Sequence, residues 1–226
     1  MSGTLFVVAT PIGNLADLTP RAAEVLGRVE LVVAEDTRRT ARLLRHLGAR
    51  PALLSLPAAR ELERVPEVLR RLEGGDVALV SDAGTPAISD PGRRLVAAAR
   101  AAGHAVSPLP GPAALAAAVS ASGLRCDRFL FLGFLPRSRS RALRLLAHGH
   151  QWALVFHESP HRLSATLGWV AEELGERPVA VARELSKLHE EWLLGPAGEL
   201  AERLRGQAVR GECTVVVEAP AGAQRG

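Results

Sequence analysis

Several residue types are scarce in this sequence, and each shortage excludes a class of protein. The 226 residues include no Tyr, five Phe and only two Cys, Cys126 and Cys213. Two cysteines are too few for a disulfide scaffold or a cysteine-rich zinc site, so we expect both thiols to be free and buried. The absence of Tyr and the scarcity of Phe also argue against an extended surface for stacking of nucleic-acid bases.

Familiar ligand-binding motifs are missing as well. The sequence has no Gly-x-Gly-x-x-Gly after a strand, no Walker A motif and no Gly-x-Ser-x-Gly nucleophile elbow. His157 and His161 have the i, i+4 spacing of metal ligands on a helix, but Pro160 lies between them and no third ligand is evident. We therefore predict that the protein holds no metal ion.

Long hydrophobic runs are absent too. The apolar run at 5–9 is too short for a signal sequence or a membrane span, and the Ala-rich stretch at 112–124 is interrupted by Ser120 and Ser122. With 47% hydrophobic and 23% charged residues, the composition is that of an ordinary globular protein. We expect a cytoplasmic protein.

Lysine is nearly absent, although the chain carries 28 basic residues and a net charge of +4. Lys187 is the single lysine. Where arginine has replaced lysine almost everywhere, a remaining lysine is a candidate for a task that needs an amine. Chance survival is the alternative.

Two windows concentrate the arginines. Residues 37–60 contain six Arg and no acidic residue, and residues 125–148 contain six Arg and one Asp. At helical spacing each window predicts a basic stripe on one face. The stripes are Arg38, Arg42 and Arg45 in the first window, and Arg137, Arg141, Arg144 and His148 in the second. We interpret them as contacts for a polyanion, folded RNA read through its backbone and shape. The alternative is two solvated helix faces.

Hydrophobic patterning predicts two α/β domains. In the first half, strands are expected at 5–9, 31–34, 52–56, 77–80 and 105–109, with helices at 20–28, 37–47, 58–72 and 91–102. These strands are continuously apolar, which is typical of parallel strands covered on both faces. The second half predicts a mixed domain with strands at 128–134, 152–157, 179–183, 190–194 and 214–218, and helices at 112–122, 138–148, 159–174 and 197–205. The Pro-rich stretch 108–112 places the boundary between domains 1–110 and 111–226.

The loops that follow the first-half strands are the candidate ligand site, because parallel strands present their carboxyl ends at one edge of a sheet. The richest loop, 81–92, has the sequence Ser-Asp-Ala-Gly-Thr-Pro-Ala-Ile-Ser-Asp-Pro-Gly. We expect Asp82 to accept hydrogen bonds from a ligand, with a turn-forming role as the alternative, and Asp90 to cap the next helix. The loop at 10–14 and Gly111 lie at the ends of neighbouring strands and should converge with it on one crevice.

Further polar loops carry alternatives that the sequence leaves open. Glu35 and Asp36 precede a helix, and either Asp36 or Thr37 caps it, so capping explains one of these residues only. In the second half, 156–162 and 182–187 each follow a strand. Either loop is a substrate-binding segment or a simple cap and turn.

Taken together, these motifs resemble a known family. Thr-Pro-Ile-Gly-Asn-Leu at 10–15, Ala-Glu-Asp-Thr-Arg at 34–38, Ser-Asp-Ala-Gly-Thr-Pro at 81–86 and Asp-Pro-Gly at 90–92 are similar to those of ribosomal RNA small subunit methyltransferase I. So are Pro-Leu-Pro-Gly-Pro at 108–112, Gly-Phe-Leu-Pro at 133–136, the Glu-Ser and His-Arg pairs at 158–162, and Ala-Arg-Glu-Leu at 182–185. The resemblance covers nearly the whole chain, in order.

The resemblance implies a fold, a cofactor and a substrate. The fold is that of the tetrapyrrole methylases, class III S-adenosylmethionine methyltransferases with two α/β domains and the cofactor in the cleft between them, and the assembly is a homodimer. The reaction is methylation of the ribose 2′-oxygen of a cytidine, cytidine 1402, in the decoding region of 16S rRNA, within the small ribosomal subunit. The absence of Gly-x-Gly-x-x-Gly agrees with this class of methyltransferase.

Site residues follow from the resemblance as hypotheses. For the cofactor they are Ile12, Gly13, Ser81, Asp82, Ala83, Gly84, Ala113 and Ala114, with second-domain loops near Phe134, Glu158 and Glu212 closing over it. Glu184 and Lys187 are the candidates at the reacting ribose, Lys187 either as a base or as a phosphate contact, and Glu35, Asp36 and Arg38 are further candidates.

The sequence departs from the family pattern in three places. Only Glu61 fits the expected stretch at 56–61, His157 replaces an aromatic residue, and Ser186 replaces a Thr but keeps its hydroxyl. Two other functions compete with rRNA methylation. A related methylase of a small molecule such as a tetrapyrrole would not need the two Arg stripes, and a non-catalytic RNA-binding assembly factor would not need the cofactor loop.

Overall fold

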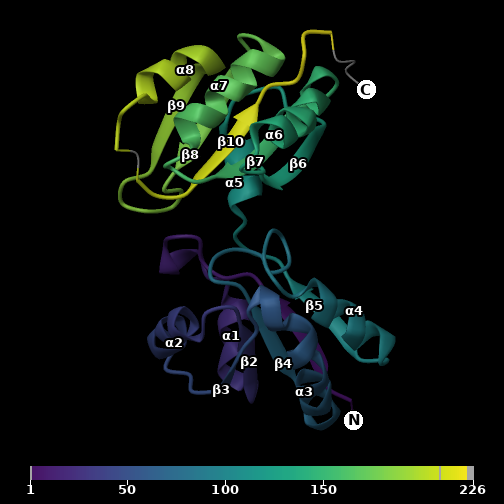
Figure 1. Cartoon of the computed structure of the whole chain (residues 1–226). Coiled ribbons are helices and arrows are strands. Elements are labelled where there is room, and N and C mark those ends of the chain that lie inside the picture. Colours follow the sequence, from purple (N-terminus) through teal and green to yellow (C-terminus); the bar gives the residue numbers. More distant parts are fainter. Residues whose placement is uncertain (1, 209, 223–226) are drawn as a thin grey trace. The chain divides into compact units, whose positions relative to one another are not determined.

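The computed structural model describes residues 2–208 and 210–222. It divides the chain into two compact units, Met1–Ala113 and Ala114–Gly226 (Figure 1). The stretch 108–112, where the sequence places a domain boundary, forms the end of the first unit.

The first unit is built on a parallel sheet. Its strands are β1 (Thr4–Val8), β2 (Leu31–Ala34), β3 (Ala52–Ser55), β4 (Val77–Val80) and β5 (Ala105–Leu109). They pair in the order β3-β2-β4-β1-β5, and every pair is parallel. The predicted parallel arrangement is confirmed, so the carboxyl ends of all five strands lie at one edge.

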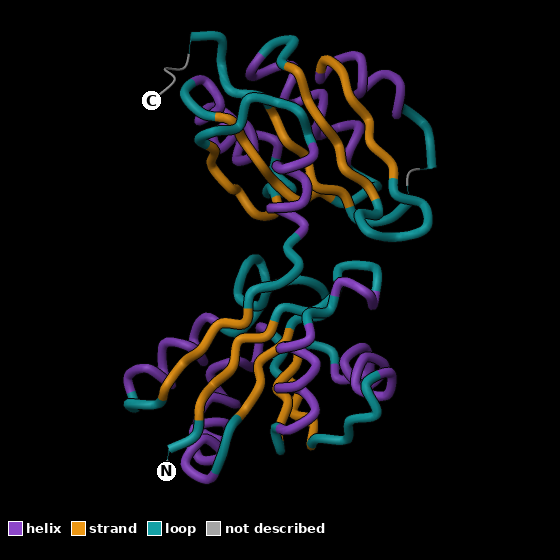
Figure 2. The backbone as a smooth tube through the Cα atoms, turned by 180° about the vertical axis from the view of Figure 1, so that it is seen from behind, coloured by secondary structure: helices purple, strands orange, loops and turns teal. Residues whose placement is uncertain are grey.

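Helices cover both faces of this sheet (Figure 2). They are α1 (Pro20–Arg28), α2 (Thr37–His46), α3 (Glu61–Gly74) and α4 (Arg93–Ala101), with short 3₁₀ turns η1 (Leu15–Asp17) and η2 (Ala58–Arg60). α1 and α2 bury Leu26 and Leu44 against one face, and α3 and α4 bury Leu72 and Leu95 against the other. Burial on both faces explains why the strands are apolar throughout.

Helix starts follow the capping chemistry of the sequence in α1 and α2, but not in α4. Thr19 accepts a hydrogen bond from the Ala22 amide and Pro20 occupies the first position of α1, as predicted. The prediction that Asp90 caps the next helix is wrong. α4 begins at Arg93 with Gly92 as its N-cap, and the amides of Gly92, Arg94 and Leu95 donate to a carboxylate from α3, described below.

The second unit contains a mixed sheet, as predicted. Its strands are β6 (Phe129–Phe134), β7 (Ala153–Glu158), β8 (Pro178–Arg183), β9 (Glu191–Pro196) and β10 (Cys213–Val217). The order is β6-β7-β10-β8-β9, in which β6 and β7 are parallel and the other pairs are antiparallel. The remaining elements are α5 (Ala114–Ala121), α6 (Arg139–Leu146), η3 (Ala147–His150), α7 (Leu163–Leu174) and α8 (Ala197–Leu204).

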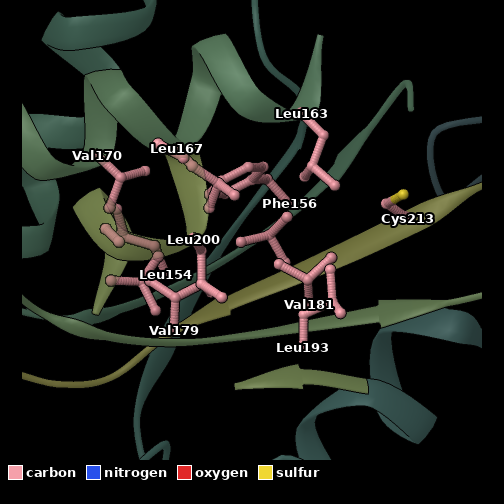
Figure 3. Packing of buried hydrophobic residues seen from close by; sticks show 14 of the residues in the cluster. Leu154, Phe156, Leu163, Leu167, Val170, Val179, Val181, Leu193, Leu200 and Cys213 are labelled. Carbon is pink, nitrogen blue, oxygen red and sulfur yellow. The ribbon is translucent and has the colours of Figure 1, made fainter. Parts of the chain in front are cut away.

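The larger core of this unit lies between the sheet and helices α6, α7 and α8. Phe156 and Val181 from the sheet meet Leu167 of α7 and Leu200 of α8 there (Figure 3). The opposite face is covered by α5, whose Ala118 packs with Val155 and Val216. Packing on both faces fixes the sheet, and the candidate residues of the second unit lie at the ends of its strands.

Cys126 and Cys213 are both free and buried, as predicted, and burial raises the pKa of the Cys213 thiol to about 12. Within the described part of the chain, no helix has the length and apolarity needed to cross a membrane.

Candidate active site

Three loops meet at the carboxyl edge of the first sheet, as the sequence predicts. Thr10 and Gly84 exchange two backbone hydrogen bonds of 2.9 and 3.0 Å, which joins the loop after β1 to the loop after β4. The Thr85 hydroxyl donates to the Pro112 carbonyl at 3.1 Å, which joins the loop after β4 to the segment after β5. The three segments therefore form one continuous surface.

Gly84 lies where these three segments meet. Its φ is +82°, a conformation that favours glycine, and a Cβ atom there would lie 3.4 Å from Ile12 Cγ2 and 3.6 Å from the Pro112 carbonyl oxygen. Gly13 is exposed in the loop after β1, and Ala113 is half-buried. Backbone groups framed by small side chains can come close to a ligand here.

Ser81 and Asp82 bind within the protein. The Ser81 side chain is buried and donates to the Gly84 carbonyl at 3.1 Å. Asp82 Oδ1 accepts from the Asp36 amide at 3.0 Å, and Asp82 Oδ2 lies 3.5 Å from Arg39 Nε. These contacts give both residues a role in fixing the loops, and direct ligand contact by either of them stays a prediction.

Glu35 and Asp36 follow β2 at the same edge of the sheet, and their pKa values are shifted in opposite directions. Asp36 caps α2 through the Arg38 amide at 2.9 Å, and the Arg38 guanidinium reaches the Asp36 carboxylate with Nε at 3.0 Å and Nη2 at 2.8 Å. These bonds hold the pKa of Asp36 at about 2. Burial, followed by the charge of Asp82, raises the pKa of Glu35. The cap is thus Asp36 rather than Thr37.

The arginine stripes are only partly as predicted. Arg38, Arg42 and Arg45 are exposed on α2, although Arg38 is occupied by Asp36. Arg141 and Arg144 are exposed on α6, and His148 is exposed on η3. The placement of Arg137 on that helical face is wrong, because α6 begins at Arg139 and Arg137 precedes it.

In the second unit, the candidate loops also meet at one sheet edge. Cys213, the first residue of β10, is opposite Glu158 at the end of β7 and opposite Arg183 at the end of β8. Phe134, the last residue of β6, is opposite His157. The loops after β6, β7 and β8 and the segment before β10 are therefore neighbours.

Glu184 and Lys187 form an ion pair in the loop after β8. Lys187 Nζ donates to Glu184 Oε1 at 2.7 Å, and the Glu212 amide donates to the same oxygen at 3.3 Å. The bond from Lys187 is the largest cause of a lowered pKa of Glu184. The pair is two-thirds or more covered, with side-chain exposures of 33% for Lys187 and 21% for Glu184. The carboxylate thus orients the only amine side chain in the sequence.

The backbone at Gly211 lies close to the Glu184 carboxylate and limits where that carboxylate can move. A Cβ atom on Gly211 would lie 2.1 Å from Glu184 Oε1, and Gly211 has a φ of +83°. Glu184 itself has a φ of +49°. The four non-glycine residues described with positive φ are Ala87 and Ser89 in the loop after β4, and Glu184 and Ser186 in the loop after β8. Backbone strain is thus confined to the two loops that carry the main candidate residues, as is common at functional sites.

Glu158 and Phe134 lie at the same edge but differ in exposure. The Glu158 side chain is fully buried and accepts hydrogen bonds from the Ser159 amide and the Thr166 hydroxyl, both at 2.7 Å. These contacts join the end of β7 to α7, and a role of this loop at the cofactor stays a prediction. Phe134 is 60% exposed and packs against the His157 ring, whose pKa is lowered by burial.

Two important residues carry weak signals in the sequence. Glu61 of α3 is buried, and its Oε1 accepts from the amides of Gly92, Arg94 and Leu95 at 3.1, 2.7 and 3.2 Å. It fixes the far end of the loop after β4. The role of Gly211 could not be predicted from the sequence, because a single glycine before a strand is common. Among the described residues no group of three His, Cys, Asp or Glu side chains could hold a metal ion.

Comparisons with known proteins identify relatives over nearly the full chain. Residues 4–201 match the model of the Tetrapyrrole (Corrin/Porphyrin) Methylases. The chain is 49% identical to a Ribosomal RNA small subunit methyltransferase I from Pseudomonas aeruginosa, covering 98% of this chain and 82% of the relative. Proteins of the same name from Escherichia coli O157:H7 and Thermotoga maritima are 47% and 45% identical, covering 96% and 95% of this chain and 78% and 98% of the relatives.

Solved structures show the same fold at lower identity. The cobalamin biosynthetic enzyme cobalt precorrin-4 methyltransferase matches with a TM-score of 0.71 and 16% identity, over 95% of this chain and 94% of that chain. Uroporphyrin-III C-methyl transferase from Thermus thermophilus, complexed with S-adenyl homocysteine, matches with a TM-score of 0.64 and 20% identity, over 96% and 97%.

Proposed function

The chain belongs to the ribosomal RNA small subunit methyltransferase I family of the tetrapyrrole methylases, and we propose that it methylates the ribose 2′-oxygen of a cytidine in 16S rRNA with S-adenosylmethionine. The observation that carries this proposal is the 49% identity to a protein named Ribosomal RNA small subunit methyltransferase I over 98% of the chain. The finer details, cytidine 1402 as the target and a cytoplasmic homodimer as the acting form, are part of the proposal and rest on the resemblance.

The first unit offers a suitable place for the cofactor, which supplies an electrophilic methyl carbon bound to a sulfonium. Ile12, Gly13, Ala83, Gly84 and Ala113 are proposed to hold it. The small side chains around Gly84 leave backbone groups accessible, and the two backbone hydrogen bonds between Thr10 and Gly84 fix the loop. Such pre-organisation lowers the entropy cost of binding. Asp82, Ala114, Phe134 and Glu212 stay predicted contacts, and Ser81 supports the loop from inside.

Lys187 and Glu184 are proposed to act on the reacting ribose. Methyl transfer to a hydroxyl needs removal of its proton, and a positioned amine can accept that proton once it has lost its own. Glu184 holds Lys187 Nζ at 2.7 Å and fixes its direction. Glu35 and Asp36 are the other candidates, of which Glu35 is the better acceptor because its pKa is raised.

The basic stripes are proposed to bind the RNA backbone. Arg42, Arg45, Arg141 and Arg144 are exposed, and Arg38 and Arg137 complete the predicted set. Arginine forks suit phosphate groups, and sequence-independent contacts of this kind position an RNA without reading its bases.

The test is methyl transfer from labelled S-adenosylmethionine to unmodified small ribosomal subunits and, in parallel, to naked 16S rRNA, followed by nuclease mapping. Label on the 2′-oxygen of a single cytidine is the expected result. Label on a tetrapyrrole but not on rRNA would replace the proposal with a small-molecule methylase. RNA binding with no methylation and no cofactor binding would instead indicate an assembly factor.

A further inference from the structure

A hollow of about 190 Å³ opens beside α2, next to the loops that are proposed to hold the cofactor. Its lining comes from three elements: the segment after β1, the start of the loop after β4, and one side of α2. The lining residues are Thr10, Pro11, Leu15, Arg39, Thr40, Arg42, Leu43, Ser81 and Asp82. The hollow lies wholly within the first unit.

The charges around this hollow favour an anion. Asp82 is its acidic residue, and its carboxylate is already bound by the Asp36 amide and Arg39. Arg42 is different, because its guanidinium has no hydrogen bond or ion pair to any residue that the structure describes. Residues 37–60 contain no acidic side chain that could neutralise it. An exposed and unpaired guanidinium suits a phosphate group.

The rest of the lining favours a flat, weakly polar ring beside that anion. Pro11, Leu15 and Leu43 contribute apolar surface, and Leu15 is 48% exposed although it belongs to a structured 3₁₀ turn. Sites for drug-sized ligands span about 300–1,000 Å³. The hollow is smaller, so it suits one unit of a longer ligand better than a whole cofactor.

We propose that this hollow receives one nucleotide of the RNA substrate, with its base or ribose against Pro11 and Leu15 and its phosphate on Arg42. The inference rests on the proposed function and adds to it a defined RNA contact. It concerns a nucleotide that is bound for positioning. It also gives a reason for the free state of Arg42, whereas Arg38 and Arg39 have carboxylate partners.

The experiment changes the charge of the hollow and its free volume in two separate variants. Arg42→Ala removes the anion contact, and Leu15→Trp fills the hollow while every charge remains. Each is compared with a matched control on the same unit: Arg100→Ala, an exposed arginine of α4, and Leu62→Trp, a 63% exposed leucine of α3. The measurements are the Kd for unmodified 16S rRNA at fixed salt, the KM for RNA, and the Kd for S-adenosylmethionine by calorimetry without RNA.

We expect Arg42→Ala to weaken RNA binding about tenfold, the loss typical of one hydrogen bond to a charged group. Leu15→Trp should also weaken RNA binding, because the indole occupies the space that the nucleotide would fill. Cofactor affinity should stay within twofold, and both control variants should behave like wild type. RNA binding within twofold of wild type in both hollow variants would overturn the inference. Weaker RNA binding in Arg42→Ala alone would mean that Arg42 is only a surface phosphate contact, and it would overturn the inference that the hollow receives a nucleotide.

Two further outcomes separate this inference from the proposed function. Weaker cofactor binding by Leu15→Trp would assign the hollow to S-adenosylmethionine and overturn the inference while leaving the function intact. A wild-type protein that neither binds nor methylates 16S rRNA would overturn the function, and the inference with it.

Discussion

A single ion pair accounts for much of what the second unit offers chemically. The Lys187 amine is held by Glu184, and Glu184 is in turn held by the Glu212 amide. The sequence alone directs attention to Lys187 because no other lysine is present. It could not show that Glu184 faces Lys187, since that contact depends on a positive φ and on the close backbone of Gly211.

Replacing Lys187 with Ala should reduce the rate of methyl transfer by about 10²–10⁴-fold, the usual contribution of a positioned acid or base. The affinity for S-adenosylmethionine should not change. Single-turnover kinetics with saturating RNA measures the effect on the chemical step. Lys187→Arg is the control, because it keeps the positive charge but cannot serve as a base near neutral pH. Full activity in Lys187→Arg would assign Lys187 to phosphate binding instead.

Gly211→Ala should disturb the same pair from the opposite side. The added methyl group would lie 2.1 Å from Glu184 Oε1, so the carboxylate must move and release Lys187. We expect kcat to fall in parallel with that of Glu184→Ala. Gly206→Ala is the matched control, because Gly206 also has a positive φ, +72°, but has open space around it. An equal loss of kcat in both variants would attribute the effect to backbone strain alone.

Ionisation of Glu35 should make the free energy of unfolding depend on pH. Its pKa is raised in the folded protein, chiefly by burial and then by Asp82. A carboxyl group with a raised folded pKa contributes stability that is fully present below its unfolded pKa, near 4.5, and lost as the pH rises through the folded value. Glu35→Gln should therefore raise Tm at pH 7 and leave it almost unchanged near pH 4. Thermal unfolding at both pH values provides the measurement, and an equal shift at both would contradict this origin.

At the scale of elements, sequence patterns locate almost all strands and helices. Runs such as Leu31–Ala34 are apolar at every position because helices cover both sheet faces, and the predicted range agrees with β2. The start of α4 could not be predicted in the same way. Asp90 has the right local sequence for a cap, but the acceptor comes from Glu61, which is 33 residues away from Arg94 in the chain. Capping by a distant side chain leaves no local pattern.

Glu61→Ala should therefore affect both stability and cofactor binding. Loss of the carboxylate leaves three amides at the start of α4 without their acceptor, which costs about 1–3 kcal/mol of the free energy of unfolding. It also frees the far end of the loop 81–92, so the affinity for S-adenosylmethionine should fall. Urea denaturation and calorimetry measure the two effects.

Glu61→Gln provides the control for this element, because its amide oxygen can still accept from the same three N–H groups. It should recover most of the stability and of the cofactor affinity. Normal cofactor binding in Glu61→Ala, despite lower stability, would show that the loop does not depend on this anchor.

For the whole molecule, the two units share an architecture but differ in sheet type and in how their basic residues are presented. The first unit has a wholly parallel sheet and exposes Arg42 and Arg45 on α2. The second has a mixed sheet and exposes Arg141 and Arg144 on α6. Charge spacing in the sequence predicts a basic stripe in each unit, but it misplaces Arg137 and does not show which arginines have a carboxylate partner. That distinction depends on carboxylates such as Asp36, which binds Arg38.

The division of basic residues between two units leads to a prediction about salt. If both stripes bind RNA, each of two double variants should weaken RNA binding. One carries Arg42→Ala and Arg45→Ala in the first unit, and the other carries Arg141→Ala and Arg144→Ala in the second. Each phosphate contact that is lost should also reduce the slope of log K against log salt by about 0.7–0.9. Titration of 16S rRNA from 50 to 300 mM salt measures both effects. Losses that add in the combined variant mean that the stripes bind separate parts of the RNA, because independent contacts contribute additively. A double variant of one unit with an unchanged slope would remove that stripe from the RNA interface.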